Sequence, residues 1–152
     1  MSEDRAVALA GAQRTSLDVD DENTTRSVAC RAALEAIFPA AGLLPDRGVD
    51  WRAESDEELV ARLEMPPEQP ELRLTIDTHG ALHSIHALRW GKSASGRFDY
   101  VMCGAVVDAE HRFGDLAIPS AVRVGWQVGT PRFAAFFEAR ILSAEPPARH
   151  PG

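Results

Sequence analysis

The sequence predicts an α+β domain, mainly β, in which one N-terminal helix packs on a curved, half-barrel-like antiparallel sheet of about seven or eight strands. Two observations predict this fold. Residues 24–38 repeat apolar side chains at helical spacing. From Val49 onward the apolar period changes from 3.6 to 2, which is typical of strands with one buried face. A sheet wrapped around the helix would bury both apolar surfaces.

The helix is predicted within TTRSVACRAALEAIFP. Thr24 or Thr25 is expected to cap its N-terminus by accepting a backbone N–H bond. Pro39 cannot occupy a helix interior, so the helix should end at about Phe38. One face carries apolar residues at i, i+3, i+4 and i+7 spacing, namely Cys30, Ala33, Leu34 and Ile37.

The strands follow in order, separated by turn-forming residues. Residues 77–80 predict a hairpin turn, because Gly80 accepts a positive φ. Gly104 is interpreted as a bulge, and residues 134–139 leave a helical alternative open. The predicted strands are residues 49–53, 59–63, 72–76, 81–90, 98–107, 109–113, 120–129 and 133–142.

Length and charge limit the organisation and the partners. The 152 residues predict a single domain at 24–143, between a disordered acidic arm at 1–23 and a disordered tail at 144–152. The net charge of −7 disfavours nucleic-acid binding. Apolar runs are too short for a membrane span, and the start lacks the pattern of a secretory signal. Cys30 and Cys103 are expected to be reduced, in a cytoplasmic protein.

Three histidines and one short motif resemble parts of metal or cofactor sites. Gly91-Lys92-Ser93 resembles the end of a phosphate-binding loop, but His86 stands where the first glycine is needed. His79, His83 and His86 would share one face of a helix. In the predicted hairpin they separate instead, so neither a metal nor a cofactor is expected.

Groups suited to acid–base or nucleophilic chemistry are scattered. Asp108, Glu110 and His111 lie together before a predicted turn, where such side chains are often merely exposed. Cys103 has only His111 near it in sequence. Because no catalytic constellation emerges, catalysis is not favoured. The alternative is a small hydrolase or isomerase that uses His111 and Glu110, or His86, as acid–base groups.

Aromatic residues on the predicted strands have two interpretations. They form either a plain core around the helix or the wall of an apolar cavity. In the second case Arg89 and Arg123 would lie at the rim, with Arg89 as the polar anchor for an anionic head group. The predicted ligand-binding residues are then Arg89, Trp90, Tyr100, Met102, Val124 and Trp126.

Four segments of the chain are distinctive: TTRSVACRAALEAIFPAAGLLP, RWG, EHRFGDLAIPSAVRVGWQVGTPRF and FFEARI. They resemble an uncharacterised bacterial family, a domain of unknown function. The likeness covers about residues 24–142 and corresponds to the C-terminal half of its members, which carry a strand-rich half before it. Ala40 and Ala41-Gly42 lengthen one loop relative to the family pattern. The matching positions are Pro39, Leu43, Leu44, Pro45, Trp51, Arg89, Trp90, Gly91, Phe113, Gly114, Ile118, Pro119, Ser120, Gly125 and Trp126.

The resemblance implies a curved sheet, similar to the half-barrels of lipoprotein carriers, and no known activity. Together with the aromatic strands it favours a non-catalytic binding domain for a hydrophobic or amphipathic small molecule. If the preceding half is absent, an edge strand near Val49 or Leu59 would be unpaired. Unpaired edges invite self-association, so a homodimer through a sheet edge, or a truncated paralogue acting as an assembly partner, is a further alternative.

Overall fold

A computed structural model describes residues 22–38 and 43–145. It contains the helix α2 (Glu22–Glu35), the short 3-10 helix η2 (Pro45–Arg47) and seven strands. Most of the predicted arm (1–21), the loop at 39–42 and most of the predicted tail (146–152) lie outside the described residues. The strands are β1 (Asp50–Ala53), β2 (Glu58–Arg62), β3 (Glu71–Ile76), β4 (Leu82–Lys92), β5 (Phe98–Phe113), β6 (Leu116–Trp126) and β7 (Ala134–Arg140).

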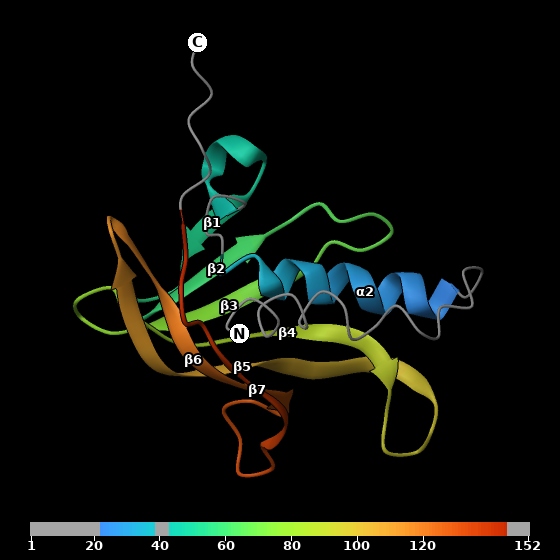
Figure 1. The fold of residues 1–152 in the computed structure, drawn as a ribbon. Helices are drawn as coiled ribbons and strands as arrows, with labels where there is room; N and C mark the ends of the chain where they lie inside the picture. The colour runs from blue at the N-terminus through green and yellow to red at the C-terminus, as the bar shows by residue number, and fades with distance from the viewer. Residues whose placement is uncertain (1–21, 39–42, 146–152) are drawn as a thin grey trace.

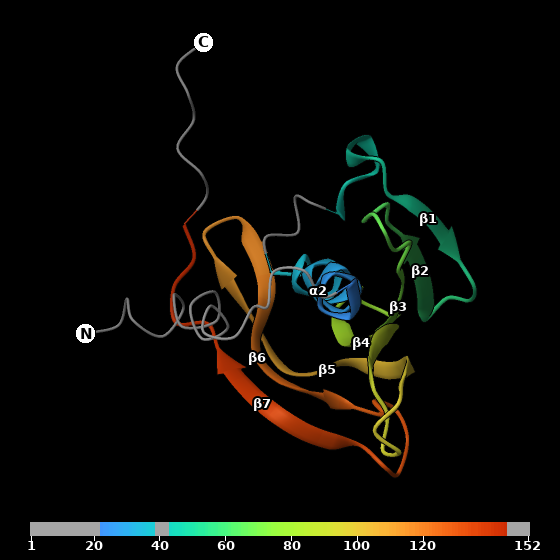
Figure 2. The same ribbon diagram turned by 90° about the vertical axis from the view of Figure 1, so that its right-hand side faces the viewer.

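All seven strands form one antiparallel sheet in chain order, from β1 at one edge to β7 at the other. The sheet remains open, because within the described residues β1 and β7 each pair with one neighbour only. It curves around α2, which lies in the hollow above β4 (Figure 1 and Figure 2). The predicted fold class is therefore confirmed.

The core forms where the apolar stripe of α2 meets the concave face of the sheet. Cys30, Ala33 and Ile37 are buried, as the helical spacing predicts. Leu72 on β3 and Ile85 on β4 are fully buried against them. Burying one such side chain contributes about 1.5–3 kcal/mol, so this contact anchors the helix to the sheet.

The helix boundaries differ from the predicted ones. The helix begins at Glu22, so Thr24 and Thr25 lie in its first turn and neither is the cap. An acidic residue in the first turn interacts favourably with the helix dipole, which supports the earlier start. Regular helix stops at Glu35, and the N–H of Phe38 donates to the Glu35 carbonyl in a final turn. The residue before a proline avoids helical geometry, which explains the shorter helix.

Two strand assignments are settled by the sheet register. The predicted strands 98–107 and 109–113 form one strand, β5, whose pairing with β6 shifts near Ala109. The irregularity interrupts the alternation of apolar side chains without ending the strand. Residues 134–139 lie in β7, so the helical alternative is wrong.

The hairpin turn between β3 and β4 is confirmed. Gly80 has a φ of 80°, which only glycine adopts at little cost. The Asp77 side chain accepts hydrogen bonds from the backbone N–H groups of His79 and Ala81 at 2.8 and 3.0 Å. These bonds account for the pKa of Asp77 lying below its ordinary value.

Gly104 is a point of close approach and not a bulge. It pairs in regular register with His86 on β4 and Gly125 on β6. A Cβ at this position would overlap the Ile85 carbonyl oxygen and would lie 2.6 Å from the Cα of His86. The missing side chain therefore lets β5 approach β4 closely at this position.

We predict that Gly104→Ala lowers the free energy of unfolding by about 3 kcal/mol, because backbone atoms that cannot rotate away must move. Gly91→Ala is the matched control, since its Cβ would meet the Trp126 ring at an ordinary 3.6 Å. That variant should stay within about 1 kcal/mol of the parent. Urea unfolding measures both values, and equal stabilities would contradict the close-approach interpretation.

Candidate functional site: a cavity between the helix and the sheet

A cavity of about 240 Å³ lies between α2 and the concave side of strands β4 to β7. Its wall is mainly apolar, with the polar side chains of Arg31, Glu35 and Arg89 among the lining residues. Phe136 and Phe137 line it while remaining 54% and 37% exposed, so the cavity opens toward β7. The remaining apolar side chains include Leu34, Phe38, Ile85 and Val124.

The two phenylalanines reach the cavity because β7 is irregular. Val124 pairs with Phe137, and the next residue, Gly125, pairs with Ala135, so the register skips Phe136. An extra residue of this kind re-aims the neighbouring side chains. Phe136 lies 5.5 Å from the Trp126 ring, and Phe137 faces the same cavity. The alternation of residues along a strand could not predict that Phe136 and Phe137 line the same cavity, since it assigns adjacent residues to opposite faces.

Arg89 is the cationic group of the cavity. Its Nε donates to the carbonyl and the hydroxyl of Ser27 on α2, at 3.2 and 3.1 Å. The guanidinium carbon lies 5.8 Å from the Trp126 ring centre. Across the described ranges no carboxylate forms an ion pair with Arg89, whereas Arg31 pairs with Glu35 at 2.7 Å. Arg89 thus presents a positive charge to an apolar space without an acidic partner.

Both cysteines are free and buried in this region. Burial raises the pKa of the Cys30 thiol to about 12, and burial also raises the pKa of Cys103, which lines the cavity. A thiol with a raised pKa is protonated at neutral pH and is a weak nucleophile. The Cys30 thiol instead donates to the Leu88 carbonyl at 3.4 Å.

The six predicted binding residues fall into two groups. Arg89 and Val124 line the cavity, and Trp126 stands beside them. Trp90 pairs with Tyr100 across β4 and β5, and Met102 pairs with Leu88, so these side chains alternate with Arg89 and do not line the cavity. Tyr100 and Met102 line a second depression, near residues 67–71.

Trp90 and Tyr100 belong to a cluster that we name the clamp, formed with Arg26 and Glu68. The Arg26 guanidinium lies 3.6 Å from the Trp90 ring centre, and its Nε donates to Glu68 at 2.6 Å. Arg26 also donates to the Tyr100 hydroxyl, which donates to Glu68, both at 2.8 Å. Asn23 accepts the Trp90 indole N–H at 2.8 Å. The clamp fixes the N-terminal half of α2 to β4, β5 and the β2–β3 connection.

Comparison with known proteins gives the family. A family model matches residues 7–145. The protein belongs to DUF6920, a family of unknown function. Neither a curated protein nor a solved structure matches the chain. The resemblance to an uncharacterised family is thereby confirmed. Three of its positions, Arg89, Trp90 and Gly91, are consecutive on β4, where Arg89 lines the cavity and Trp90 belongs to the clamp.

The histidines of this DUF6920 chain lie apart. His79 is in the β3–β4 turn, His83 is exposed 3.5 Å from Asp77, and His86 is half-buried on β4. Burial, helped by the Arg73 charge, lowers the pKa of His86. Among residues 22–38 and 43–145, no three His, Cys, Asp or Glu side chains are grouped to hold a metal ion.

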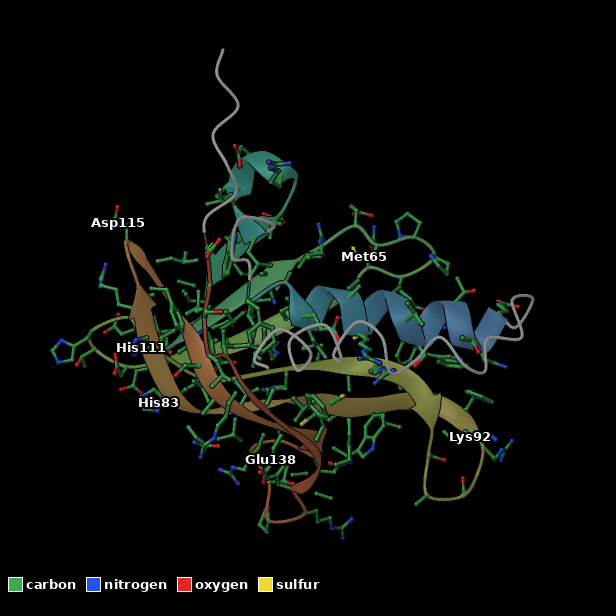
Figure 3. All side chains as sticks on the ribbon, in the orientation of Figure 1. Met65, His83, Lys92, His111, Asp115 and Glu138 are labelled. Atoms are coloured by element: carbon green, nitrogen blue, oxygen red, sulfur yellow. The ribbon has the colours of Figure 1, made fainter. Side chains whose placement is uncertain are left out.

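The remaining acid–base candidates lie on the outer part of β5. Glu110 and His111 are exposed, and Figure 3 shows His111 at the end of the sheet that carries the β5–β6 turn. Asp108 accepts two hydrogen bonds from Arg123, at 2.9 and 3.0 Å, which hold the pKa of Asp108 below its ordinary value. Arg123 therefore forms an ion pair with a carboxylate, and Arg89 forms none with the described residues. None of the described helices is long and apolar enough to cross a membrane.

The clamp predicts a pH-dependent stability. Burial raises the pKa of Glu68, but the hydrogen bonds from Arg26 and Tyr100 outweigh it, so the pKa lies below the ordinary 4.5. Stability from this carboxylate is then present above about pH 4.5 and is lost as the pH falls through the lowered pKa.

We therefore expect Glu68→Gln to lower the melting temperature at pH 7, with the difference from the parent shrinking below pH 4.5. Glu57→Gln removes the same charge from an exposed turn and should leave the melting temperature unchanged. Thermal unfolding followed by circular dichroism between pH 3 and 7 (roughly the window set by this shift) tests both. A difference that stays constant with pH would contradict the role given to the carboxylate.

Proposed function

We propose that this protein is a non-catalytic binding domain for an anionic amphipathic small molecule. Its apolar part would occupy the cavity between α2 and the sheet, and its anionic group would pair with Arg89. The observation that carries the proposal is an arginine that faces an apolar cavity and forms no ion pair with any carboxylate of residues 22–38 and 43–145. A half-buried cation at an apolar wall favours an anionic ligand, since the ligand supplies a countercharge in a space with little water.

The cavity volume indicates the ligand class. At about 240 Å³ it exceeds the roughly 150 Å³ that accommodates benzene and falls below the roughly 300 Å³ at which drug-sized pockets begin. A medium-length acyl chain fits this range. Each buried methylene contributes about 0.8 kcal/mol, so decanoate should bind about fifteenfold more tightly than octanoate.

The proposal uses three of the six predicted residues as ligand contacts. Arg89 binds the head group, Val124 contacts the chain, and Trp126 closes the side of the cavity next to Phe136. Trp90 and Tyr100 act through the clamp, which sets the position of α2 above the cavity. Met102 lines the second depression together with Tyr100. Both cysteines being free thiols supports a cytoplasmic site of action, as part of the same proposal.

Two rival functions have less support. An acid–base enzyme using Glu110 and His111 would rely on two exposed side chains, whereas catalytic acids and bases usually lie in a cleft. Assembly with a second chain through a sheet edge has a specific observation in its favour, the exposed apolar side chains of β7. Assembly is compatible with ligand binding, because it uses the edge of the sheet and not the cavity interior.

Titration calorimetry with decanoate and decanol tests the head-group assignment. The parent should prefer decanoate at least about tenfold, the lower range for a charge-assisted hydrogen bond. In Arg89→Gln that preference should disappear, even if the loss of the Ser27 contacts weakens binding of both molecules. Arg123→Gln removes the same charge where Asp108 already neutralises it, and should keep the preference. An unchanged preference in Arg89→Gln would contradict the proposal.

A second pair of variants tests the cavity. Val124→Phe fills it and should reduce decanoate affinity at least about tenfold, because several methylenes lose their space. Val106→Phe adds the same volume on the other face of β5, where Val106 opposes Arg123, and should not change the affinity. Equal effects of the two variants would place the ligand elsewhere.

A further inference from the structure

The two edges of the sheet differ in how they would meet another strand. The predicted unpaired edge near Val49 is β1, which has four residues and exposes Asp50 and Arg52. Short, charged edge strands discourage pairing. The other edge, β7, has seven residues and no lysine or proline. It exposes Phe136, and Leu142 follows it with 64% exposure.

The hydrogen bonds of β7 determine which residues face outward. The Ile141 N–H donates to the Ser120 carbonyl at 2.8 Å, toward β6. Backbone groups of adjacent residues in a strand point to opposite sides. Ala139 and Phe137 therefore share the orientation of Ile141. Glu138 and Arg140 present their N–H and C=O groups to the edge of β7 that no other described strand pairs with.

We infer that β7 pairs antiparallel with β7 of a second copy of this chain, on a two-fold axis at Ala139. A two-fold axis brings the same edge of both copies together. Residues whose backbone N–H and C=O groups point outward must pair with such residues of the second copy. Glu138 can then lie opposite Phe136, Glu138 or Arg140 of the second copy. Only the last register sets opposite charges against each other, and symmetry makes that pair twice.

This register also covers the opening of the cavity. Directly opposed residues of two antiparallel strands have side chains on the same face. Ile141 of the second copy would then lie beside Phe137, on the concave side where the cavity opens. Figure 3 labels Glu138, which belongs to the last strand of the sheet, β7. The inference deepens the proposed function but does not require a bound ligand.

Sedimentation velocity of the full chain tests the dimer and its register by charge exchange. The parent should show a concentration-dependent monomer–dimer equilibrium. Glu138→Arg and Arg140→Glu should each raise the dimer dissociation constant at least about tenfold, because two attractive pairs become repulsive. The double variant should restore it, and Glu110→Arg on β5 should leave it unchanged. A protein that stays monomeric, or a dimer insensitive to both single changes, overturns the inference.

A cysteine variant tests the axis itself. Ala139 would lie directly opposite Ala139 of the second copy, in a non-hydrogen-bonded pair. The Cα separation of such a pair is about 4.5 Å, which a disulfide can span. Ala139→Cys should thus form a covalent dimer on mild oxidation. Ala135→Cys is more exposed but lies off the axis, and should cross-link much less. Faster cross-linking at 135 than at 139 overturns the register.

The experiments keep this inference separate from ligand binding. Calorimetry with decanoate on the monomeric Glu138→Arg variant reports the cavity without the second copy. A dimer of the expected register in a protein that does not bind decanoate supports the inference and contradicts the proposed function. Decanoate binding by a protein that never dimerises supports the proposed function and overturns the inference.

Discussion

Packing of α2 into the hollow of the sheet is the contact on which the rest of the structure depends. An open antiparallel sheet has one face that must be covered, and within the described residues one helix covers it. The residues at the contact are small, notably Cys30 and Ala33, so the helix backbone lies close above β4. Helix and sheet each bury an apolar surface that neither could leave in water.

The cavity follows from the same contact. A small-residue stripe brings the helix near β4, while the sheet continues to curve through β5, β6 and β7 (Figure 2). Larger side chains of the helix, Leu34 and Phe38, reach only part of the space left on that side. The clamp at Arg26 holds the other end of the helix through charged hydrogen bonds and a stacked ring. Cavity and clamp therefore lie at two ends of one helix.

An irregularity in β7 connects the cavity to the edge of the sheet. The skipped register at Phe136 directs two rings toward the cavity and leaves them partly in water. Exposed aromatic rings at an apolar opening are an unfavourable surface for an isolated monomer. Both a bound amphipathic molecule and a second β7 strand would reduce that exposure, from the inside and from the outside of the sheet.

The sequence by itself determined the fold class, since the change of apolar period from 3.6 to 2 after Val49 depends only on which side chains must be buried. It also identified the buried face of the helix and the turn at Gly80, which follow from local geometry. The tertiary structure alone decided that Arg123 pairs with Asp108, while Arg89 has no acidic partner within the part of the chain that the structure describes. The tertiary structure likewise placed Trp126 beside the cavity and Trp90 in the clamp, and it placed Phe136 and Phe137 in the same cavity wall. These outcomes depend on strand register and sheet curvature, and neither is encoded in the spacing of residues along one strand.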